Sequence, residues 1–446
     1  MASVSINNTS SNDVENVAAE LDTSCYLPKT PWVKFILVCL VFSVWGIAAS
    51  LNDVLIPQFR KGFELSDTQS ALVQSVFFFG YFAFALPAAT VVKKYSYKTA
   101  IVVGLSLYAL GCFMFIPAAN MMTYAAFLGC LLVISSGLAF LETSCNTYST
   151  LMGNIDTSTQ RLNFSQVFNS VGVFLGIFIG QQLVFSESDA SHEELLAMAP
   201  EAADAIRAEM VGQVVSPYIY MGIFLLILAA VFAFLKFPAC RPAEAATKEE
   251  EKVDVKASIA RLFQIPHFRK GLMTQFLYVG AQVGIWSFTI RFAQMIYQGM
   301  TEHAAANYLM AGLVIYAVGK AIATAMMKRI EPSKLLGIYG IINFSLITFA
   351  ALNPSELSLF AVIASNLFMS PMFPTTYGLC VKGLGKDTSF AGSLVVMTIG
   401  GGAVVPPLMG MMSDALGGNM QLAFILPALC FAYIGYYGLY CNKRGL

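Results

Sequence analysis

Long apolar runs separated by short polar segments recur along most of the chain, and their lengths indicate its architecture. Twelve runs reach the length of about 20 mainly apolar residues that a membrane-spanning helix needs. They are continuous rather than alternating in hydrophobicity, which argues against a transmembrane β-barrel, and a lone spanning segment satisfies its backbone in lipid only as a helix. The predicted spans are 33–58, 68–92, 99–118, 123–151, 161–185, 214–237, 270–297, 304–327, 333–352, 356–381, 389–413 and 419–441.

The longest polar connection on one side of the predicted membrane separates the first six spans from the last six. It contains "EAATKEEEKVDVKAS", which predicts a charged linker with surface helix. The two halves also resemble each other: "VVKKYSYKTAIVVG" after the second span matches "MMKRIEPSKLLGIYG" after the eighth, and "NTYSTLMG" matches "TTYGLCVKG". Parallel repeats of six helices are typical of the major facilitator fold, with two halves around a central cavity. The predicted segments are a tail 1–32, a half 33–237, a linker 238–268, a half 269–441 and a tail 442–446.

The distribution of basic residues predicts the orientation of this all-α integral membrane protein. With both termini on one side, that side carries 21 Lys and Arg, and the opposite loops carry three. Basic residues concentrate in cytoplasmic loops, so both termini are predicted to be cytoplasmic.

Composition agrees with a membrane protein and excludes several other classes. The chain is 57% hydrophobic and only 12% charged, whereas soluble domains carry about 25% charged residues. The net charge is zero, so the chain lacks the excess of basic residues that is typical of nucleic-acid-binding proteins. "GLGKDT" has Cys380 where a nucleotide-binding loop needs its first glycine, so no nucleotide is expected. The nine cysteines and three histidines show no ligand spacing, and we expect no metal and no cofactor.

Two carboxylic acids lie inside apolar runs. Glu142 is near the middle of the fourth span, in "GLAFLETSCNTYS", and Asp53 is toward the outer end of the first, in "AASLNDVLIPQF". A charge at membrane depth costs at least about 2.5–3.5 kcal/mol, so both are functional candidates. Burial disfavours the ionised form of a carboxyl, which suits it to load and release a proton during transport. The alternatives are an interfacial charge for Asp53 and a structural ion pair for Glu142.

Amide and aromatic side chains share helix faces in three spans, and their chemistry suits a polyol. Asn146 follows Glu142 by four residues and lies on the same face. Amides offer both donors and acceptors, and an aromatic face fits the apolar face of a pyranose. Hydrogen bonds between helices, or anchoring of Trp286 at the interface, are the alternatives. The other candidates are Asn163, Gln166 and Asn169 in the fifth span, Gln275, Tyr278, Gln282 and Trp286 in the seventh, and the intramembrane residues Asn52 and Lys320.

Seven segments of the sequence, in order and spacing, resemble the fucose:proton symporter family of the major facilitator superfamily. The resemblance runs from about residue 35 to 435 and covers "LNDVLIPQF", "FFFGYFAFALPA", "GLAFLETSCNTY", "RLNFSQVFNSVG", "QFLYVGAQVGIWSF", "FPTTYGLCVKGLG" and "MTIGGGAVVPPLMGMMSD". It implies a monomeric symporter of the bacterial cytoplasmic membrane that works by alternating access. It also implies that Asp53 and Glu142 couple protonation to sugar, and that Gln166 and Asn169 line the sugar cavity.

This resemblance predicts L-fucose and a proton as substrates, with no enzymatic activity. Ser50, Thr147 and Lys320 depart from the family pattern, which leaves the sugar open to other hexoses such as galactose, glucose, mannose or N-acetylglucosamine. A facilitator or antiporter of the same fold is one alternative. A membrane sugar sensor and an intramembrane acid–base enzyme are alternatives of other classes.

Overall fold

The computed structural model describes residues 23–63, 72–183, 200–240, 255–297, 300, 302–417 and 419–446, and throughout these residues the chain is built from helices. The first half contains α1 (Trp32–Gly62), α3 (Leu72–Lys94), α4 (Tyr97–Met121), α5 (Tyr124–Leu151), α6 (Ser158–Leu183) and α8 (Pro200–Phe234). A short helix, α9 (Val255–Gln264), precedes the second half. The second half contains α10 (Pro266–Ile296), α11 (Glu302–Met326), α12 (Pro332–Leu352), α13 (Glu356–Met369), α14 (Met372–Val381), α15 (Thr388–Met397), η4 (Thr398–Ala403), α16 (Val405–Ala415), α17 (Met420–Ala423) and α18 (Ile425–Lys443).

Length and hydropathy confirm most of the spans. In the described part of the chain, ten helical segments are long and apolar enough to cross a membrane. Helices α6 and α10, with 26 and 31 residues, are as long but more polar. These two carry the predicted amide stripes, so their polarity comes from residues that the sequence already singled out.

Three spans differ from the continuous helices that were predicted. The tenth divides into α13 and α14, and the twelfth begins with the short α17. The eleventh is interrupted by the 3-10 segment η4, which contains the three consecutive glycines. Pro406 and Pro407 lie in the first turn of α16, where a missing backbone N–H is tolerated. The glycine segment, not the proline pair, therefore makes the break.

The sixth span begins earlier than predicted. Helix α8 starts at Pro200, within the acidic loop 186–213 that the sequence placed outside the membrane. Residues 184–199 of that loop lie outside the described residues, as do 1–22 of the N-terminal tail and 241–254 of the linker. Of the linker segment in which surface helix was expected, only residues 255–258 are described, and they form the start of α9.

Glycines let helices approach closely within each half. A Cβ at Gly172 of α6 would collide with the backbone of Ser43 in α1, and one at Gly137 of α5 would lie 2.6 Å from the carbonyl oxygen of Gly104 in α4. Small residues at such crossings are the usual way for membrane helices to pack, because dispersion contacts rather than water exclusion hold them together.

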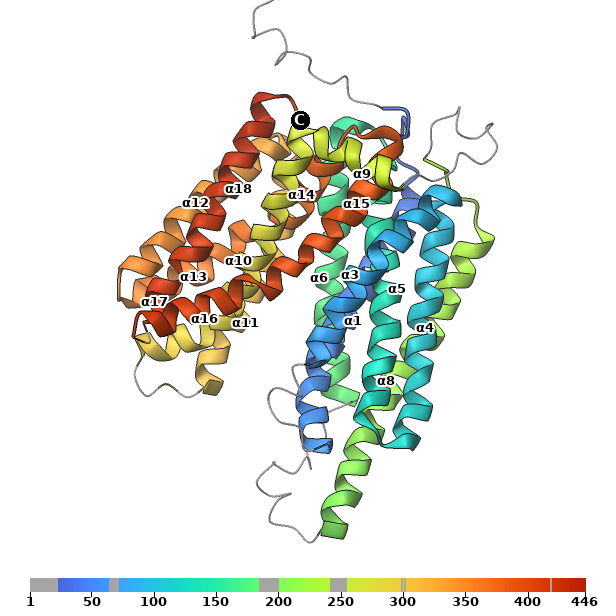
Figure 1. Ribbon diagram of the computed structural model, residues 1–446, viewed down its shortest axis with the longest axis vertical. Helices are drawn as coiled ribbons and strands as arrows, with labels where there is room; N and C mark the ends of the chain where they lie inside the picture. The colour runs from blue at the N-terminus through green and yellow to red at the C-terminus, as the bar shows by residue number, and fades with distance from the viewer. Residues whose placement is uncertain are drawn as a thin grey trace, which may run out of the picture.

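The two halves meet at the end of the bundle where α1 begins and α18 ends, which we call the terminal end (Figure 1). Helices α3, α5 and α6 contact α11, α14 and α15 there, and the apolar core of the first half continues into α14 and α15. Toward the opposite end the ribbons of the halves diverge.

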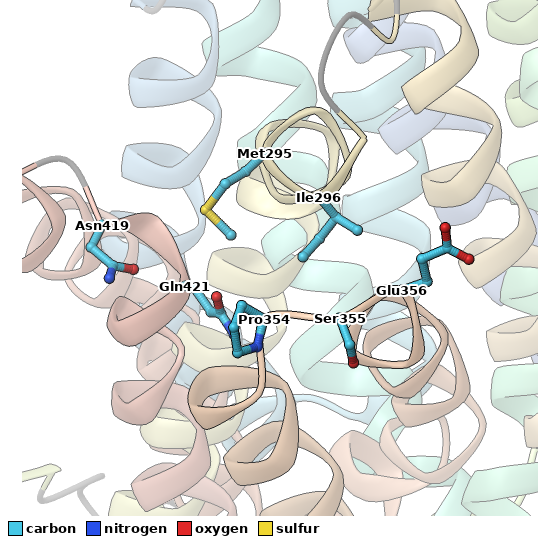
Figure 2. A pocket seen from close by; sticks show the side chains of 7 residues that line it. All are labelled: Met295, Ile296, Pro354, Ser355, Glu356, Asn419 and Gln421. Atoms are coloured by element: carbon cyan, nitrogen blue, oxygen red, sulfur yellow. The ribbon is translucent and has the colours of Figure 1, made fainter.

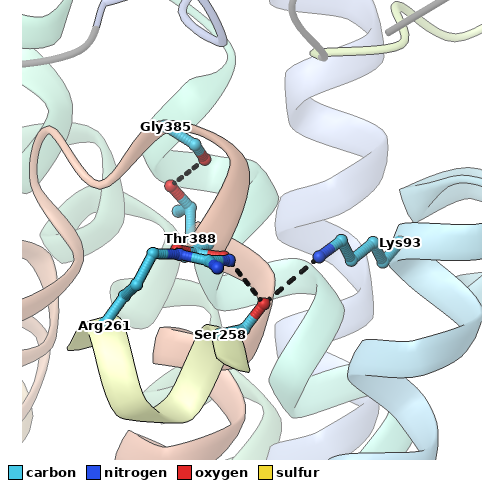
Figure 3. Close-up of polar contacts among 6 residues, drawn as sticks. Lys93, Ser258, Arg261, Gly385 and Thr388 are labelled. Carbon is cyan, nitrogen blue, oxygen red and sulfur yellow. Dashed lines mark hydrogen bonds and ion pairs between the residues drawn. The ribbon is translucent and has the colours of Figure 1, made fainter. Parts of the chain in front are cut away.

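Polar bonds also join the halves at the terminal end. The guanidinium of Arg261 in α9 donates to both carboxylate oxygens of Asp387, each at 2.8 Å. It also donates to the hydroxyl of Ser258, which in turn accepts a bond of 3.3 Å from Lys93 of α3 (Figure 3). The linker helix thus connects the first half to the start of α15.

Candidate functional site

Glu142 lies in a buried stretch of α5. Every residue of α5 from Ile134 to Leu151 is buried, because α5 is packed against α1, α3, α4, α6, α14 and α15. The Glu142 side chain is 1% exposed. Among the described residues, neither of its carboxyl oxygens has a hydrogen-bond partner, and none forms an ion pair with it. Tyr81 of α3 and Tyr377 of α14 lie within electrostatic range of it. A structural ion pair, the alternative for this residue, is therefore not what the described residues form.

A pair of amides lies one helical turn from Glu142. The Nε2 of Gln166 donates to the Oδ1 of Asn146 at 3.1 Å, and both side chains are buried. The Nδ2 of Asn146 has no partner. The pair therefore keeps a free donor beside an unpartnered carboxyl.

The other two amides of the α6 stripe bond to neighbouring helices. Asn163 donates to the hydroxyl of Thr375 in α14 at 3.2 Å, across the contact between the halves. Asn169, which is half-buried, donates to the carbonyl oxygen of Phe42 in α1 at 3.3 Å. All three amides of the stripe thus form hydrogen bonds between helices: Asn163 to α14, Asn169 to α1 and Gln166 to Asn146 of α5.

The second half contributes an aromatic group. The indole N–H of Trp286 donates to Oδ1 of Asn366 at 2.8 Å, and its ring meets Tyr316 edge-on with centroids 5.3 Å apart. The hydroxyl of Tyr278 donates to the carbonyl oxygen of Met369 and lies 3.2 Å from the hydroxyl of Tyr316. These bonds hold the rings in fixed positions along α10 and α11.

Two further amides of α10 are buried. Gln282 is 9% exposed, and Gln275 is fully buried with neither amide atom hydrogen-bonded. Gln275 lies one turn nearer the terminal end than Tyr278.

Lys320 lies at the contact between the two halves. Its side chain is 4% exposed, and its Nζ donates to the backbone carbonyl of Gln166 at 3.5 Å. The same Nζ lies 4.9 Å from the ring centroid of Tyr316. This carbonyl belongs to the opposite half of the molecule.

The backbone of Asn52 and Asp53 lies in α1, but their side chains are outside the described residues. The structure therefore does not test either side chain.

Sequence reasoning missed Asn366, Tyr316, Tyr81 and Thr375. Asn366 stands alone in the apolar segment "IASNLFM", which is the same signal that revealed Glu142. The two tyrosines and the threonine are common in membrane helices, and only the packing distinguishes them.

A separate pocket of about 400 Å³ lies at the end of the second half opposite the terminal end (Figure 2). It contains none of the predicted site residues, and the carboxylate of Glu356 points away from it. Its lining is Met295, Ile296, Pro354, Ser355, Glu356, Asn419 and Gln421. Within the described part of the chain, no group of three His, Cys, Asp or Glu side chains is placed to hold a metal ion.

Comparison with known proteins identifies the family. The model of the Major Facilitator Superfamily matches residues 35–389. The chain belongs to the major facilitator superfamily. The L-fucose-proton symporter of Escherichia coli is 40% identical over 403 residues, which cover 90% of this chain and 91% of the relative. The glucose/galactose transporter of Brucella abortus is 36% identical, covering 91% of this chain and 93% of the relative.

Solved structures agree with this assignment. The crystal structure of the transporter FucP in its outward conformation matches this major facilitator with a TM-score of 0.86 and 39% identity, covering 92% of this chain and 98% of that one. The predicted fold, a multi-pass helical membrane protein with two six-helix halves, is therefore confirmed, and the relatives are transporters rather than enzymes.

Proposed function

We propose that this major facilitator takes up L-fucose together with a proton. The observation that carries the proposal is Glu142, a buried carboxyl without a hydrogen-bond partner beside the Asn146–Gln166 amide pair. A carboxyl with no compensating donor is stable there only when it carries a proton. The relatives named as L-fucose-proton symporters support the choice of sugar.

The proposed mechanism is alternating access between the two halves. A proton from outside neutralises Glu142, and sugar hydroxyls bond to Asn146 and Gln166 while the sugar ring lies against Trp286. Loss of the buried charge lowers the free energy of closing the cavity around the sugar, so the loaded carrier favours the exchange of conformations. Asp53 is the second acid of the pathway, and Gln282 and Asn169 are further sugar contacts.

A second candidate is symport of another hexose by the same mechanism. The relatives named as glucose/galactose transporters are up to 36% identical over 91% of this chain, and Lys320 departs from the family pattern. We propose galactose and glucose as the first alternatives to L-fucose.

We further propose that the terminal end faces the cytoplasm, so that both chain termini lie on the cytoplasmic side of the bacterial cytoplasmic membrane. The excess of Lys and Arg at this end supports that orientation. In this orientation the halves diverge toward the outside in the arrangement of Figure 1. We also propose that the protein acts as a monomer embedded in the bilayer.

The test is proton uptake by de-energised proteoliposomes that contain the purified protein. L-fucose, D-galactose, D-glucose, D-mannose and N-acetylglucosamine are added in turn while the external pH is followed. We expect alkalinisation with L-fucose. Entry of radiolabelled sugar without alkalinisation would indicate a facilitator, and no entry of any sugar would refute the sugar assignment.

A further inference from the structure

Lys320 is a buried basic residue that faces the other half of the molecule. It lies in α11 of the second half, yet its hydrogen bond is to the backbone of Gln166 in α6 of the first. A second bond between the same two helices also crosses between the halves. It runs from Gln160 of α6 to the carbonyl of Thr324, four residues after Lys320 in α11. The contact between α6 and α11 must be broken for the terminal end to open, so Lys320 is placed to take part in the exchange of conformations.

The charged and titratable groups around Lys320 are few. On α10 and α11 they are the hydroxyls of Tyr278 and Tyr316, and among the described residues of α6 and α13 no carboxylate reaches its Nζ. Among the described residues, the first buried acid along this chain of contacts is Glu142. It is separated from Lys320 by Gln166, whose side chain bonds to Asn146 one turn from Glu142.

Lys320 and Glu142 differ in how well their ionised forms are stabilised. The ammonium group has a carbonyl oxygen and the face of Tyr316, both of which favour a cation. The carboxylate has no donor at either oxygen. An ionised Glu142 is therefore the costly species in the enclosed site, and a positive charge enclosed with it would lower that cost.

We propose that Lys320 provides the counter-charge that lets the empty, deprotonated carrier return. This inference rests on the proposed symport. In the loaded step Glu142 is neutral because it carries the proton, so it needs no counter-charge. After the sugar and proton leave, Glu142 is an anion, and the halves must exchange conformations with that anion enclosed. Lys320 brings the net charge of the enclosed pair to zero in this return step.

The experiment compares two modes of transport in proteoliposomes containing Lys320→Met. Sugar counterflow uses only the loaded carrier, and net downhill uptake also needs the empty carrier to return. We expect counterflow close to that of the unmodified protein, with net uptake lower on the order of tenfold. Counterflow also shows that the variant is folded. Lys328→Met, which removes an exposed lysine beyond the end of the same helix, is the matched control and should leave both modes unchanged.

A double variant tests the charge relation directly. Glu142→Gln combined with Lys320→Met removes both buried charges, and we expect net downhill uptake to recover although it is no longer coupled to protons. Lys320→Arg keeps the charge and should retain net uptake. Equal loss of counterflow and net uptake in Lys320→Met, or no loss of either, would overturn the inference. Absence of proton coupling in the unmodified protein would instead refute the proposed symport.

Discussion

Among single residues, Glu142 makes the sharpest prediction. Glu142→Gln mimics the protonated acid, so sugar exchange should continue while pH-driven accumulation is lost. Accumulation is measured as the ratio of internal to external sugar under an imposed pH gradient, with exchange measured in parallel. Glu356→Gln, which changes an exposed acid at the start of α13, is the control and should accumulate sugar normally. Normal accumulation by Glu142→Gln would exclude this residue as the proton carrier.

Gln166 makes a second prediction at this scale. Gln166→Leu removes a sugar hydrogen bonder and leaves the amide of Asn146 without its partner. An unmet buried hydrogen bond costs about 1–3 kcal/mol, so the apparent affinity for sugar should fall between about fivefold and 150-fold. The measurement is the concentration dependence of counterflow. Gln213→Leu in α8 is the comparison, and an equal loss of affinity there would indicate a nonspecific effect.

The sequence identified the residues whose chemistry conflicts with their surroundings. Glu142 and Lys320 were found because a charge inside an apolar run is conspicuous, and the structure shows both to be buried. It could not tell which neighbouring helix each amide of α6 bonds to. Asn163, Gln166 and Asn169 have the same spacing and chemistry, and only the positions of α1, α5 and α14 distinguish them.

Among elements, the contact of α1 with α6 depends on glycine. A methyl group at Gly172 would overlap the backbone of Ser43, with the Ser43 Cα 2.7 Å from the new carbon. Gly172→Ala should therefore lower the stability by about 1–3 kcal/mol, the usual cost of overpacking. Gly129→Ala in α5 is the control, since nothing lies within 4 Å of its added carbon. Thermal unfolding in detergent compares them, and equal melting temperatures would show that the helices can separate without cost.

Helix positions were predictable because a span is fixed by length and hydropathy, which are local properties. The second to fifth predicted spans agree with α3, α4, α5 and α6 to within a few residues. The breaks in the tenth and eleventh spans were not predicted, because they depend on neighbouring helices. Gly401 of η4, for example, lies against the backbone of Phe276 in α10. Hydropathy does not record such a contact.

For the whole molecule, the sequence predicted two halves but not the conformation that they adopt. The halves contact each other at the terminal end, where Thr147 of α5 and Tyr377 of α14 share a hydrogen bond of 2.8 Å. Gly392 of α15 lies beside both side chains. These contacts come from residues far apart in the chain that are polar or small in many helices, so no local pattern predicts that they meet.

The same contact allows a test of alternating access. A Cβ at residue 392 would lie 3.6 Å from the Cβ of Thr147, within the range of about 3.5–4.5 Å that a disulfide requires. We expect Thr147→Cys with Gly392→Cys to form a disulfide on oxidation. Tyr377→Phe is included because its hydroxyl would lie 2.5 Å from the new carbon. The nine native cysteines are all buried, which limits their competing oxidation.

Oxidation should hold the terminal end closed. Sugar should then still bind from the opposite side, where the ribbons of the halves diverge in this conformation (Figure 1), but both counterflow and net uptake should stop and return when the disulfide is reduced. The two single-cysteine variants in the same Tyr377→Phe background should transport equally under oxidising and reducing conditions. Continued transport by the fully oxidised pair would mean that the sugar crosses without separation of α5 from α15, and the rocking of two rigid halves would be wrong.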